Sequence, residues 1–268
     1  MRGTSLDLYD LAGLEASLAD TVFAGNLHFS PVTDSTNSDA LAAARSGAPH
    51  GSVYFADEQL AGRGRGDHTW DSAAGDGLYA SVLLCAPIPA TRLPLLPLAA
   101  GLAAAEAIHS AAGLIVDLRW PNDLLLGPRK VGGILVESKI SGGSADYVVV
   151  GIGINVHQLA FASDLSTSAT SLDLEAGRRV SRQDLLLSLL KSLQCETLLL
   201  ADSAACVTIP ERVEQASTWI RGRRVEVHGP QACTGVTAGL DENGFLLVQT
   251  EVGLVTVQTG GIRAAEIS

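Results

Sequence analysis

An almost continuous apolar run, rich in β-branched valine and isoleucine, extends from Tyr147 to Ile154. Such residues favour an extended backbone, and a run without polar alternation suits a strand in the interior of a sheet. The run Leu93–Ala112 is instead mostly leucine and alanine and predicts a buried helix, with Pro94 and Pro97 near its start, where proline is tolerated. The sequence therefore predicts a core that contains both strands and helices.

Further elements follow from periodicity and capping. The polar residues Asp34–Asn37 predict a capped helix over Asp39–Arg45, and Ser181 with Asp184 has capping-box-like spacing before a helix at Leu185–Leu200. Strands are predicted at Val53–Ala56, Leu78–Leu84, Val116–Trp120 and Val131–Ser138.

The pattern changes after Ile220 to short strands separated by glycine-rich turns. Those strands are expected at Arg224–Val227, Gly235–Ala238, Phe245–Gln249 and Leu254–Val257. We therefore predict a large domain over residues 1–219 and a small β-barrel domain over residues 220–268, which a chain of 268 residues accommodates.

Composition restricts the function classes. Apolar residues make up 47% of the chain, so a substantial core can form, and the formal net charge of −11 opposes binding to phosphate backbones or membrane surfaces. The four cysteines and six histidines are scattered, which argues against a disulfide framework or a zinc site. No signal peptide is recognisable, and Leu93–Ala105 is shorter than the ~20 residues of a membrane span. We expect a soluble, cytoplasmic protein.

The segment Gln59–Gly66, followed by Trp70, is the sharpest local feature. Its glycines alternate with Arg63 and Arg65, so exposed backbone N–H groups and forked cationic donors can surround a carboxylate or a phosphate. The segment matches neither a P-loop nor a dinucleotide fingerprint. Taken alone, it fits a flexible solvated loop or an RNA-binding Arg-Gly segment equally well.

Two other segments could carry chemistry at strand ends. Arg119–Asp123 leads into Lys130 and Gly133, which places a point charge beside a backbone that a ligand can approach closely. Gly151–Asn155 closes the apolar strand with two glycines and an asparagine that could bond to a ribose or a phosphate. Each also fits a plain turn or bulge, just as Ser35–Asn37 fits a simple helix cap.

Together, in their order and spacing, these motifs resemble those of the biotin–protein ligase family, from about Phe29 to the C-terminus. The matching features are Asp34–Asn37, Gln59 with Gly62–Arg65 and Trp70, Trp120–Asp123, Lys130 with Gly133, and Gly151, Gly153 and Asn155.

The resemblance implies an α+β fold, in which a mixed sheet flanked by helices, similar to class II synthetases, precedes a small SH3-like β-barrel. It also implies a two-step reaction. Biotin and ATP, which carries its own Mg²⁺, give biotinyl-5′-AMP and pyrophosphate. A lysine of a biotin carboxyl carrier protein or domain, from acetyl-CoA carboxylase or a related carboxylase, then displaces AMP. Both a monomer and a homodimer are compatible with the resemblance, and no nucleic-acid or membrane partner is expected.

The resemblance also assigns roles to residues. Biotin would be bound by Ser35, Thr36, Asn37, Gln59, Gly62, Arg63, Gly64, Arg65, Lys130, Gly133 and Gly153. ATP and the adenylate would be bound by Arg63, Arg65, Trp70, Asn122, Lys130 and Asn155. Catalysis would rest on Arg65, Lys130 and Asp123, the last either accepting a proton from the incoming amine or orienting Lys130.

The chain departs from the family pattern in two places. Asp67, His68 and Thr69 stand where many bacterial relatives have a further Gly-Arg pair, which bears on how tightly the loop retains the adenylate. Arg119 stands where lysine is frequent before Trp-Pro-Asn-Asp. Residues 1–30 are too short for a DNA-binding domain, so a monofunctional ligase is expected. The rivals are a lipoate–protein ligase or octanoyltransferase of related fold, and a non-catalytic RNA-binding module.

Overall fold

A computed structural model describes residues 9–66, 68–85, 88–162, 167–202 and 204–265. Its main sheet has seven strands in the order β1-β2-β3-β7-β6-β5-β4. Strands β1 and β2 run parallel and every other neighbouring pair is antiparallel, so the sheet is mixed, as predicted. The strands are β1 (Leu27–Thr33), β2 (Val53–Gln59), β3 (Gly77–Leu84), β4 (Asp117–Arg119), β5 (Asp123–Leu126), β6 (Arg129–Ser141) and β7 (Ser144–Asn155).

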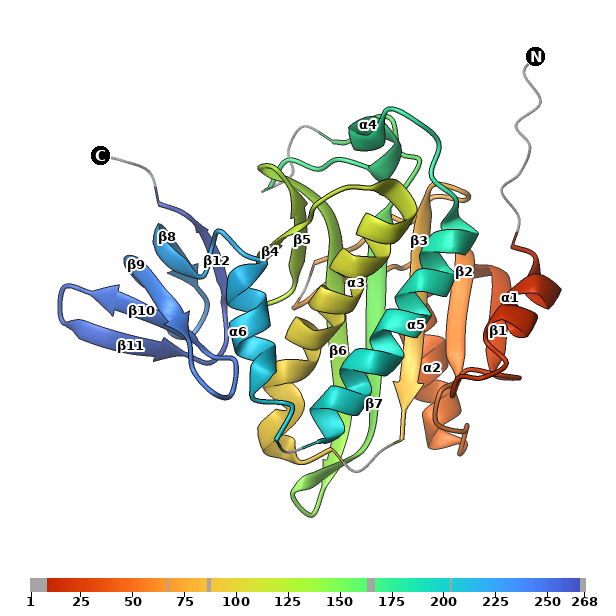
Figure 1. Ribbon diagram of the computed structural model, residues 1–268, viewed down its shortest axis with the longest axis horizontal. Coiled ribbons are helices and arrows are strands. Elements are labelled where there is room, and N and C mark those ends of the chain that lie inside the picture. The colour runs from red at the N-terminus through yellow and green to blue at the C-terminus, as the bar shows by residue number, and fades with distance from the viewer. Residues whose placement is uncertain (1–8, 67, 86–87, 163–166, 203, 266–268) are drawn as a thin grey trace.

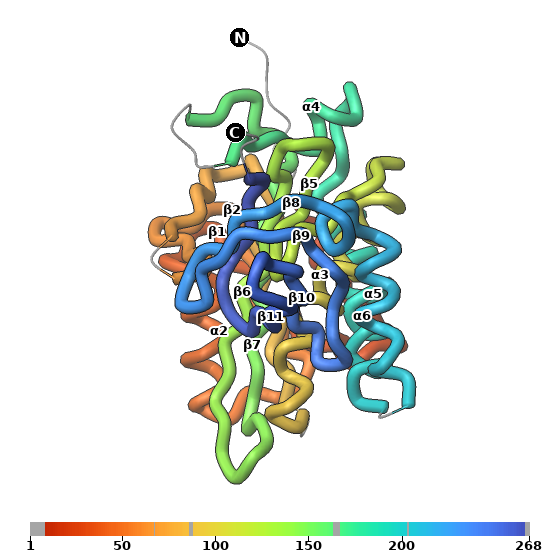
Figure 2. The backbone as a smooth tube through the Cα atoms, turned by 90° about the vertical axis from the view of Figure 1, so that its left-hand side faces the viewer, coloured from red at the N-terminus to blue at the C-terminus, as the bar shows by residue number. Residues whose placement is uncertain are grey.

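Helices cover both faces of this sheet (Figures 1 and 2). The helices are α1 (Leu11–Ser17), α2 (Thr36–Arg45), α3 (Leu96–Ala112), α4 (Leu172–Ala176), α5 (Arg182–Ala201) and α6 (Thr208–Gln215), with a 3-10 turn at Ala90–Leu95 before α3. Helix α2 packs on β2, β3 and β7 from one side, while α3 and α5 pack against each other on the opposite side.

Alternation along the central strands separates the two faces. Val148 and Val150 belong to the large core under α3 and α5, whereas Val149 joins Ala40 and Leu83 in a small cluster under α2. Residues of β7 with odd numbers therefore face α2, because successive side chains of a strand point to opposite faces. This parity decides which residues of the sheet can reach a ligand on the α2 side.

The predicted leucine-alanine helix forms the centre of the large core. The stretch Ala90–Ala112 is long and apolar enough by composition to cross a membrane, but most of it is buried inside the protein. Small residues such as Ala99, Ala103 and Ala107 are completely buried and let α3 lie close to α5. Its composition therefore reflects a core position.

Side-chain caps were predicted at the N-termini of two helices, and the structure confirms one of them. Ser181 caps α5 as expected, because its side chain accepts a hydrogen bond from the backbone N–H of Asp184. Ser35 occupies the N-cap position of α2 but makes no capping bond with its side chain, so the side-chain cap predicted there is wrong. Gln59 Oε1 instead accepts the N–H of Thr36 at 2.9 Å, and a residue distant in sequence thus satisfies the helix end.

A second, antiparallel sheet of five strands begins at Arg221 and has the order β11-β10-β9-β8-β12, as expected of an SH3-like unit (Figure 1). Its strands are β8 (Arg221–His228), β9 (Cys233–Leu240), β10 (Leu246–Thr250), β11 (Gly253–Val257) and β12 (Gly261–Ala264). The indole N–H of Trp120 donates to the carbonyl of Gly244 at 3.0 Å and ties this sheet to the main one.

Strands β1, β5 and β12 and helices α4 and α6 were not expected from the sequence. Strand β1 includes Pro31, which has no N–H for a ladder, and lies at the edge of the main sheet, where proline is tolerated. Strand β5 has only four residues. Segments this short or this irregular carry too little periodicity to be recognised locally.

Candidate functional site

Glycines on the α2 face of the sheet form the floor of the site. A Cβ atom on Gly151 would lie 2.0 Å from Asn37 Oδ1, and one on Gly153 would lie 2.7 Å from Trp70 Nε1. Gly153 pairs with Gly133 of β6 in the ladder. Any side chain at Gly151 or Gly153 would therefore displace groups that line the site, which explains the Gly-x-Gly spacing at the end of β7.

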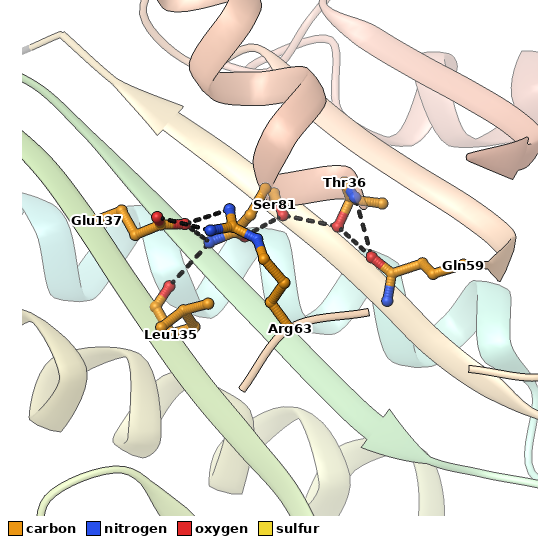
Figure 3. A network of polar contacts seen from close by, with 7 residues as sticks. Thr36, Gln59, Arg63, Ser81, Leu135 and Glu137 are labelled. Carbon is orange, nitrogen blue, oxygen red and sulfur yellow. Dashed lines mark hydrogen bonds and ion pairs between the residues drawn. The ribbon is translucent and has the colours of Figure 1, made fainter. Parts of the chain in front are cut away.

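A hydrogen-bonded chain of polar side chains lies beside this floor, at the N-terminus of α2 (Figure 3). Thr36 Oγ1 donates to Gln59 Oε1 at 3.2 Å and lies 2.8 Å from Ser81 Oγ. Ser81 Oγ in turn donates to Asn37 Oδ1. Thr36, Asn37 and Ser81 are nearly fully buried, so their polar groups are oriented in advance. Ser81 was not predicted. It lies two residues after Tyr79 on β3, so both side chains point to the α2 face of the sheet.

The Arg-Gly segment folds into a tight hairpin. Arg63 and Thr69 form an antiparallel bridge, the N–H of Gly64 donates to the carbonyl of His68 at 2.7 Å, and that of Trp70 donates to Gly62 at 2.9 Å. Asp67, in the part of the loop that departs from the family pattern, lies outside the described residues. The hairpin brings Arg63, Arg65 and Trp70 to the site face.

Gly62 does not line the cavity, unlike the other predicted ligand-binding residues. It is buried at the base of the hairpin, where a Cβ atom would lie 2.3 Å from the carbonyl oxygen of Trp70. Its requirement for glycine is therefore steric, and a direct contact of Gly62 with biotin stays a prediction.

Arg63 is already paired with a carboxylate. Its two terminal nitrogens lie 3.0 Å and 2.7 Å from the two oxygens of Glu137, and Asn37 Nδ2 donates to the same carboxylate at 2.8 Å (Figure 3). Glu137 was not predicted, although it lies on β6 at even spacing from Gly133 and so faces the same side. Arg65, by contrast, has no hydrogen bond or ion pair to another described residue and lines the cavity.

Lys130 and Asp123 form the second charged group of the site. Lys130 Nζ lies 2.5 Å from Asp123 Oδ1, and Arg119 donates to Asp123 Oδ2 through Nε and Nη2 at 3.0 Å and 2.7 Å. Burial raises the pKa of the Asp123 carboxyl, but Lys130 and Arg119 together lower it by more, so the net pKa lies below its ordinary value of 3.8. Asp123 is therefore an ionised group held by two cations.

The two asparagines bond mainly to the backbone. Asn122 Nδ2 donates to the carbonyl of Ile134 at 2.7 Å, which fixes the turn after Trp120 against β6. Asn155 Nδ2 donates to the carbonyl of Thr170 at 3.0 Å and holds the segment that follows β7. Both line the cavity, but these contacts position loops.

One cavity of about 650 Å³ connects most of these groups, a size typical of small-molecule sites; Gly62, Ser81 and Glu137 lie behind its wall. The predicted residues on its wall are Ser35, Thr36, Asn37, Gln59, Arg63, Gly64, Arg65, Trp70, Asn122, Asp123, Lys130, Gly133, Gly153 and Asn155. The small sheet contributes His228–Pro230 and Gly260–Arg263, and the segment after β7 contributes Gln158 and Phe161. These additional residues carry no motif, so no local signal in the sequence could have identified them.

Unsatisfied polar atoms on the wall fit a polar ligand. Trp70 Nε1 and Gln158 Oε1 are buried and have no hydrogen-bond partner among the described residues. Such atoms are rare unless a ligand or water completes them. No group of three or more His, Cys, Asp or Glu side chains suited to a metal occurs within the described ranges. The cations Arg65 and Lys130 on the wall suit an anionic organic ligand.

Comparison with known proteins agrees with this geometry. A sequence profile of the Biotin/lipoate A/B protein ligase family matches residues 29–155. The bifunctional ligase/repressor BirA of Bacillus subtilis is 32% identical over 253 residues, which cover 91% of this chain and 76% of that protein. The biotin–[acetyl-CoA-carboxylase] ligase of Mycobacterium tuberculosis is 34% identical over 248 residues, covering 86% and 85%.

Solved structures show the same fold. The biotin protein ligase from Aquifex aeolicus in complex with biotin and ATP superposes with a TM-score of 0.77 at 31% sequence identity, covering 89% of this chain and 98% of that one. The match extends over nearly the whole of each protein. On the evidence of the motifs, the cavity and these relatives, the chain belongs to the biotin–protein ligase family.

Proposed function

We propose that the protein is a biotin–protein ligase that couples biotin to a lysine of a carrier protein with ATP. In the first step a biotin carboxylate oxygen attacks the α-phosphorus of ATP, the bond to pyrophosphate breaks, and biotinyl-5′-AMP forms. In the second step a lysine amine attacks the adenylate carbonyl, an amide forms and AMP leaves. One observation carries the proposal: a single cavity joins the oriented polar chain at α2 to the cations Arg65 and Lys130.

The first step requires two anions to approach each other. A carboxylate and a triphosphate repel, and positive charge placed where the new bond forms lowers that barrier. Arg65 supplies a guanidinium that has no hydrogen bond or ion pair to another described residue. Burial lowers the pKa of this guanidinium, and the nearby Asp123 carboxylate raises it by less. Lys130 supplies a compact ammonium that Asp123 holds beside Gly133. Mg²⁺ bound to ATP would add further charge on the phosphates.

The polar chain at α2 suits the ureido ring of biotin. That ring offers one carbonyl acceptor and two N–H donors, and Ser35, Thr36, Asn37 and Gln59 present hydroxyl and amide groups at one end of the cavity. Buried partners of this kind discriminate strongly, because a ligand without the matching groups leaves them unpaired. A lipoyl or octanoyl chain has no ureido group, so this end of the site favours biotin.

Asp123 acts in this proposal by orienting Lys130. Both of its oxygens are already bonded to cations, and its lowered pKa makes it a weak proton acceptor. Of the two roles that the sequence suggested, the geometry favours positioning over proton transfer from the incoming amine.

The small sheet contributes one wall of the cavity, and we propose that residues 220–268 form a domain that closes this side of the site. Its position depends on the bond between Trp120 and Gly244 and on the cation–π contact of Arg223, on β8, with Trp219, at 3.7 Å from the ring centroid. The turn that carries Asn122 thus also anchors this sheet.

A free sheet edge beside the site suits a protein partner. Strand β5 pairs only with Arg129–Gly133 of β6, so the remainder of β6 has no strand partner on that side among the described residues. Its outer part is exposed, including Ile140 at 53%. We place the carrier domain at this edge, where an added strand would bring its lysine near the cavity. A second copy of the chain could use the same edge. We also place the protein in the cytoplasm, a compartment that supplies ATP.

The decisive experiment is pyrophosphate exchange into ATP with biotin, lipoate or octanoate as the acid. We expect exchange with biotin alone, followed by labelling of a biotin carboxyl carrier domain at one lysine. Exchange with lipoate or octanoate in place of biotin would identify the rival ligase. Salt-dependent RNA binding without any exchange would favour the binding-module alternative.

A further inference from the structure

The pair formed by Arg63 and Glu137 links the Arg-Gly hairpin directly to β6. The guanidinium contacts both carboxylate oxygens in a parallel, two-bond arrangement that fixes its plane as well as its position. The side chains of Arg63 and Glu137 are 39% and 27% exposed, so water partly screens the charges while the geometry remains defined.

Glu137 also connects the hairpin to the biotin end of the site. Its carboxylate accepts from Asn37, whose Oδ1 accepts from Ser81 Oγ, which lies 2.8 Å from Thr36 Oγ1. The backbone N–H of Thr36 then donates to Gln59 Oε1 at 2.9 Å. Gln59 Nε2 then donates to Ser72 Oγ at 2.8 Å, and Ser72 Oγ donates to the carbonyl of Trp70 at 3.1 Å. The bonds therefore form a circuit that leaves the hairpin at Arg63 and returns to it at Trp70. Figure 3 shows the part of this circuit from Arg63 to Gln59.

The two arginines of the hairpin consequently differ in how much positive charge they offer to a ligand. Arg63 is neutralised by Glu137, so its contribution to attracting a phosphate is small. Arg65 has no partner among the described residues and remains available. Loss of the Glu137 charge would free Arg63 and detach one side of the hairpin from the sheet.

We propose that Glu137 is a positioning residue, which holds the Arg-Gly hairpin over the cavity through Arg63 and thereby determines how long the adenylate is retained. This role rests on the proposed function. Arg65, not Arg63, is then the ligand-contacting arginine of the hairpin.

Hydrogen exchange on the ligand-free protein tests the positioning role. The N–H groups of Gly64 and Trp70 are bonded within the hairpin, so their exchange reports its opening. Glu137→Gln keeps the side-chain size and an oxygen for Asn37 but removes the charge opposite Arg63. We expect exchange at these amides to rise about fivefold, the range of a partly exposed bidentate pair. The matched control is Asp146→Asn, on the same β6–β7 hairpin but paired with Lys139.

Enzyme kinetics supply a second readout. In Glu137→Gln the dissociation rate of biotinyl-5′-AMP and the KM for biotin should each rise about fivefold, with a smaller change in kcat. Arg63→Gln should have the same effect, and the double variant should be no worse than either single one, because both substitutions break one pair.

The proposal is overturned if hydrogen exchange at the amides of Gly64 and Trp70 is the same in Glu137→Gln as in wild type. It is also overturned if the kinetic effects of Glu137→Gln and Arg63→Gln add in the double variant. If Glu137→Gln does not fold, Arg63→Gln is measured in its place, because it breaks the same pair and Arg63 is the more exposed partner. A wild-type protein without biotin-dependent pyrophosphate exchange would refute the proposed function, while the amide exchange of the ligand-free protein would still decide the role of Glu137.

Discussion

The ammonium of Lys130 lies 2.5 Å from Asp123 Oδ1, while Arg119 holds the other oxygen of the same carboxylate. The three charges therefore form a fixed group with a net charge of one positive unit. The long lysine side chain is restrained at its tip, which reduces the conformational entropy lost when a ligand binds. The arrangement makes the cation at Lys130 a preorganised element of the cavity wall.

Substitution of Lys130 by alanine should reduce adenylate formation by at least about a hundredfold, because it removes a positive charge from the place where two anions meet. Asp123 keeps its contact with Arg119, so the fold should persist. The measurement is biotin-dependent pyrophosphate exchange, with circular dichroism to check folding. Near-native exchange by the variant would contradict the role given to Lys130. Lys139→Ala, an exposed lysine on the same strand, serves as the control.

Substitution of Asp123 by asparagine should destabilise the protein in a pH-dependent way. The pKa of this carboxyl is depressed in the folded state, so its ionised form stabilises the fold above its ordinary pKa of 3.8, and this stabilisation disappears as pH falls through the lower folded pKa. The free energy of unfolding in urea should therefore differ between Asp123→Asn and wild type at pH 7 and converge in acid below that range. A constant difference at all pH values would show that the ionisation of Asp123 makes no contribution.

Substitution of Gly151 by alanine should weaken biotin binding. The new Cβ would lie 2.0 Å from Asn37 Oδ1, so Asn37 must move and lose its bonds to Ser81 and Glu137. We expect the KM for biotin to rise about tenfold or more, the cost of one broken buried polar contact, with a smaller change for ATP. Gly101→Ala on α3, where the nearest atom to the new Cβ is 3.5 Å away, should leave both constants unchanged. Equal changes for the two substrates would argue against a biotin subsite at Asn37.

Arg182 should be important for stability. Its guanidinium is almost completely buried, donates to Asp57 Oδ1 at 2.8 Å and lies 5.2 Å from the ring centroid of Tyr9. Arg182→Ala leaves a half-buried carboxylate without this partner and should lower the free energy of unfolding by about 3 kcal/mol. Urea denaturation provides the value, and Arg178→Ala at an exposed position should change it by less than about 0.5 kcal/mol. A loss as small as that of the control would show that the Arg182 pair adds no net stability.

Most helices and strands were predictable where the apolar residues follow a long, regular pattern. The strand at Tyr147–Ile154 and the helix at Leu185–Leu200 were found because each buries a long, regular apolar pattern. Strand β1 and helix α6 were not found, since Pro31 interrupts the first and the second spans only eight residues. Their conformations are stabilised by packing and by the adjoining strands, which local propensity does not record.

The sequence alone determined the chemistry of the site, because glycines, asparagines and cations in a fixed order already indicate an anionic ligand near a strand end. Tertiary structure decided which of these groups pair with each other. Only the parity of β6 brings Glu137 to face Arg63, and only the folding of the turn after Trp120 places Asp123 between Lys130 and Arg119. Pairings between residues 74 positions apart depend on strand register and sheet order, which arise from the packing of the whole chain. The sequence therefore identified the glycines, asparagines and cations of the site but not Glu137 or Ser81. The fold paired Arg63 with a carboxylate and left Arg65 on the cavity wall without such a partner among the described residues.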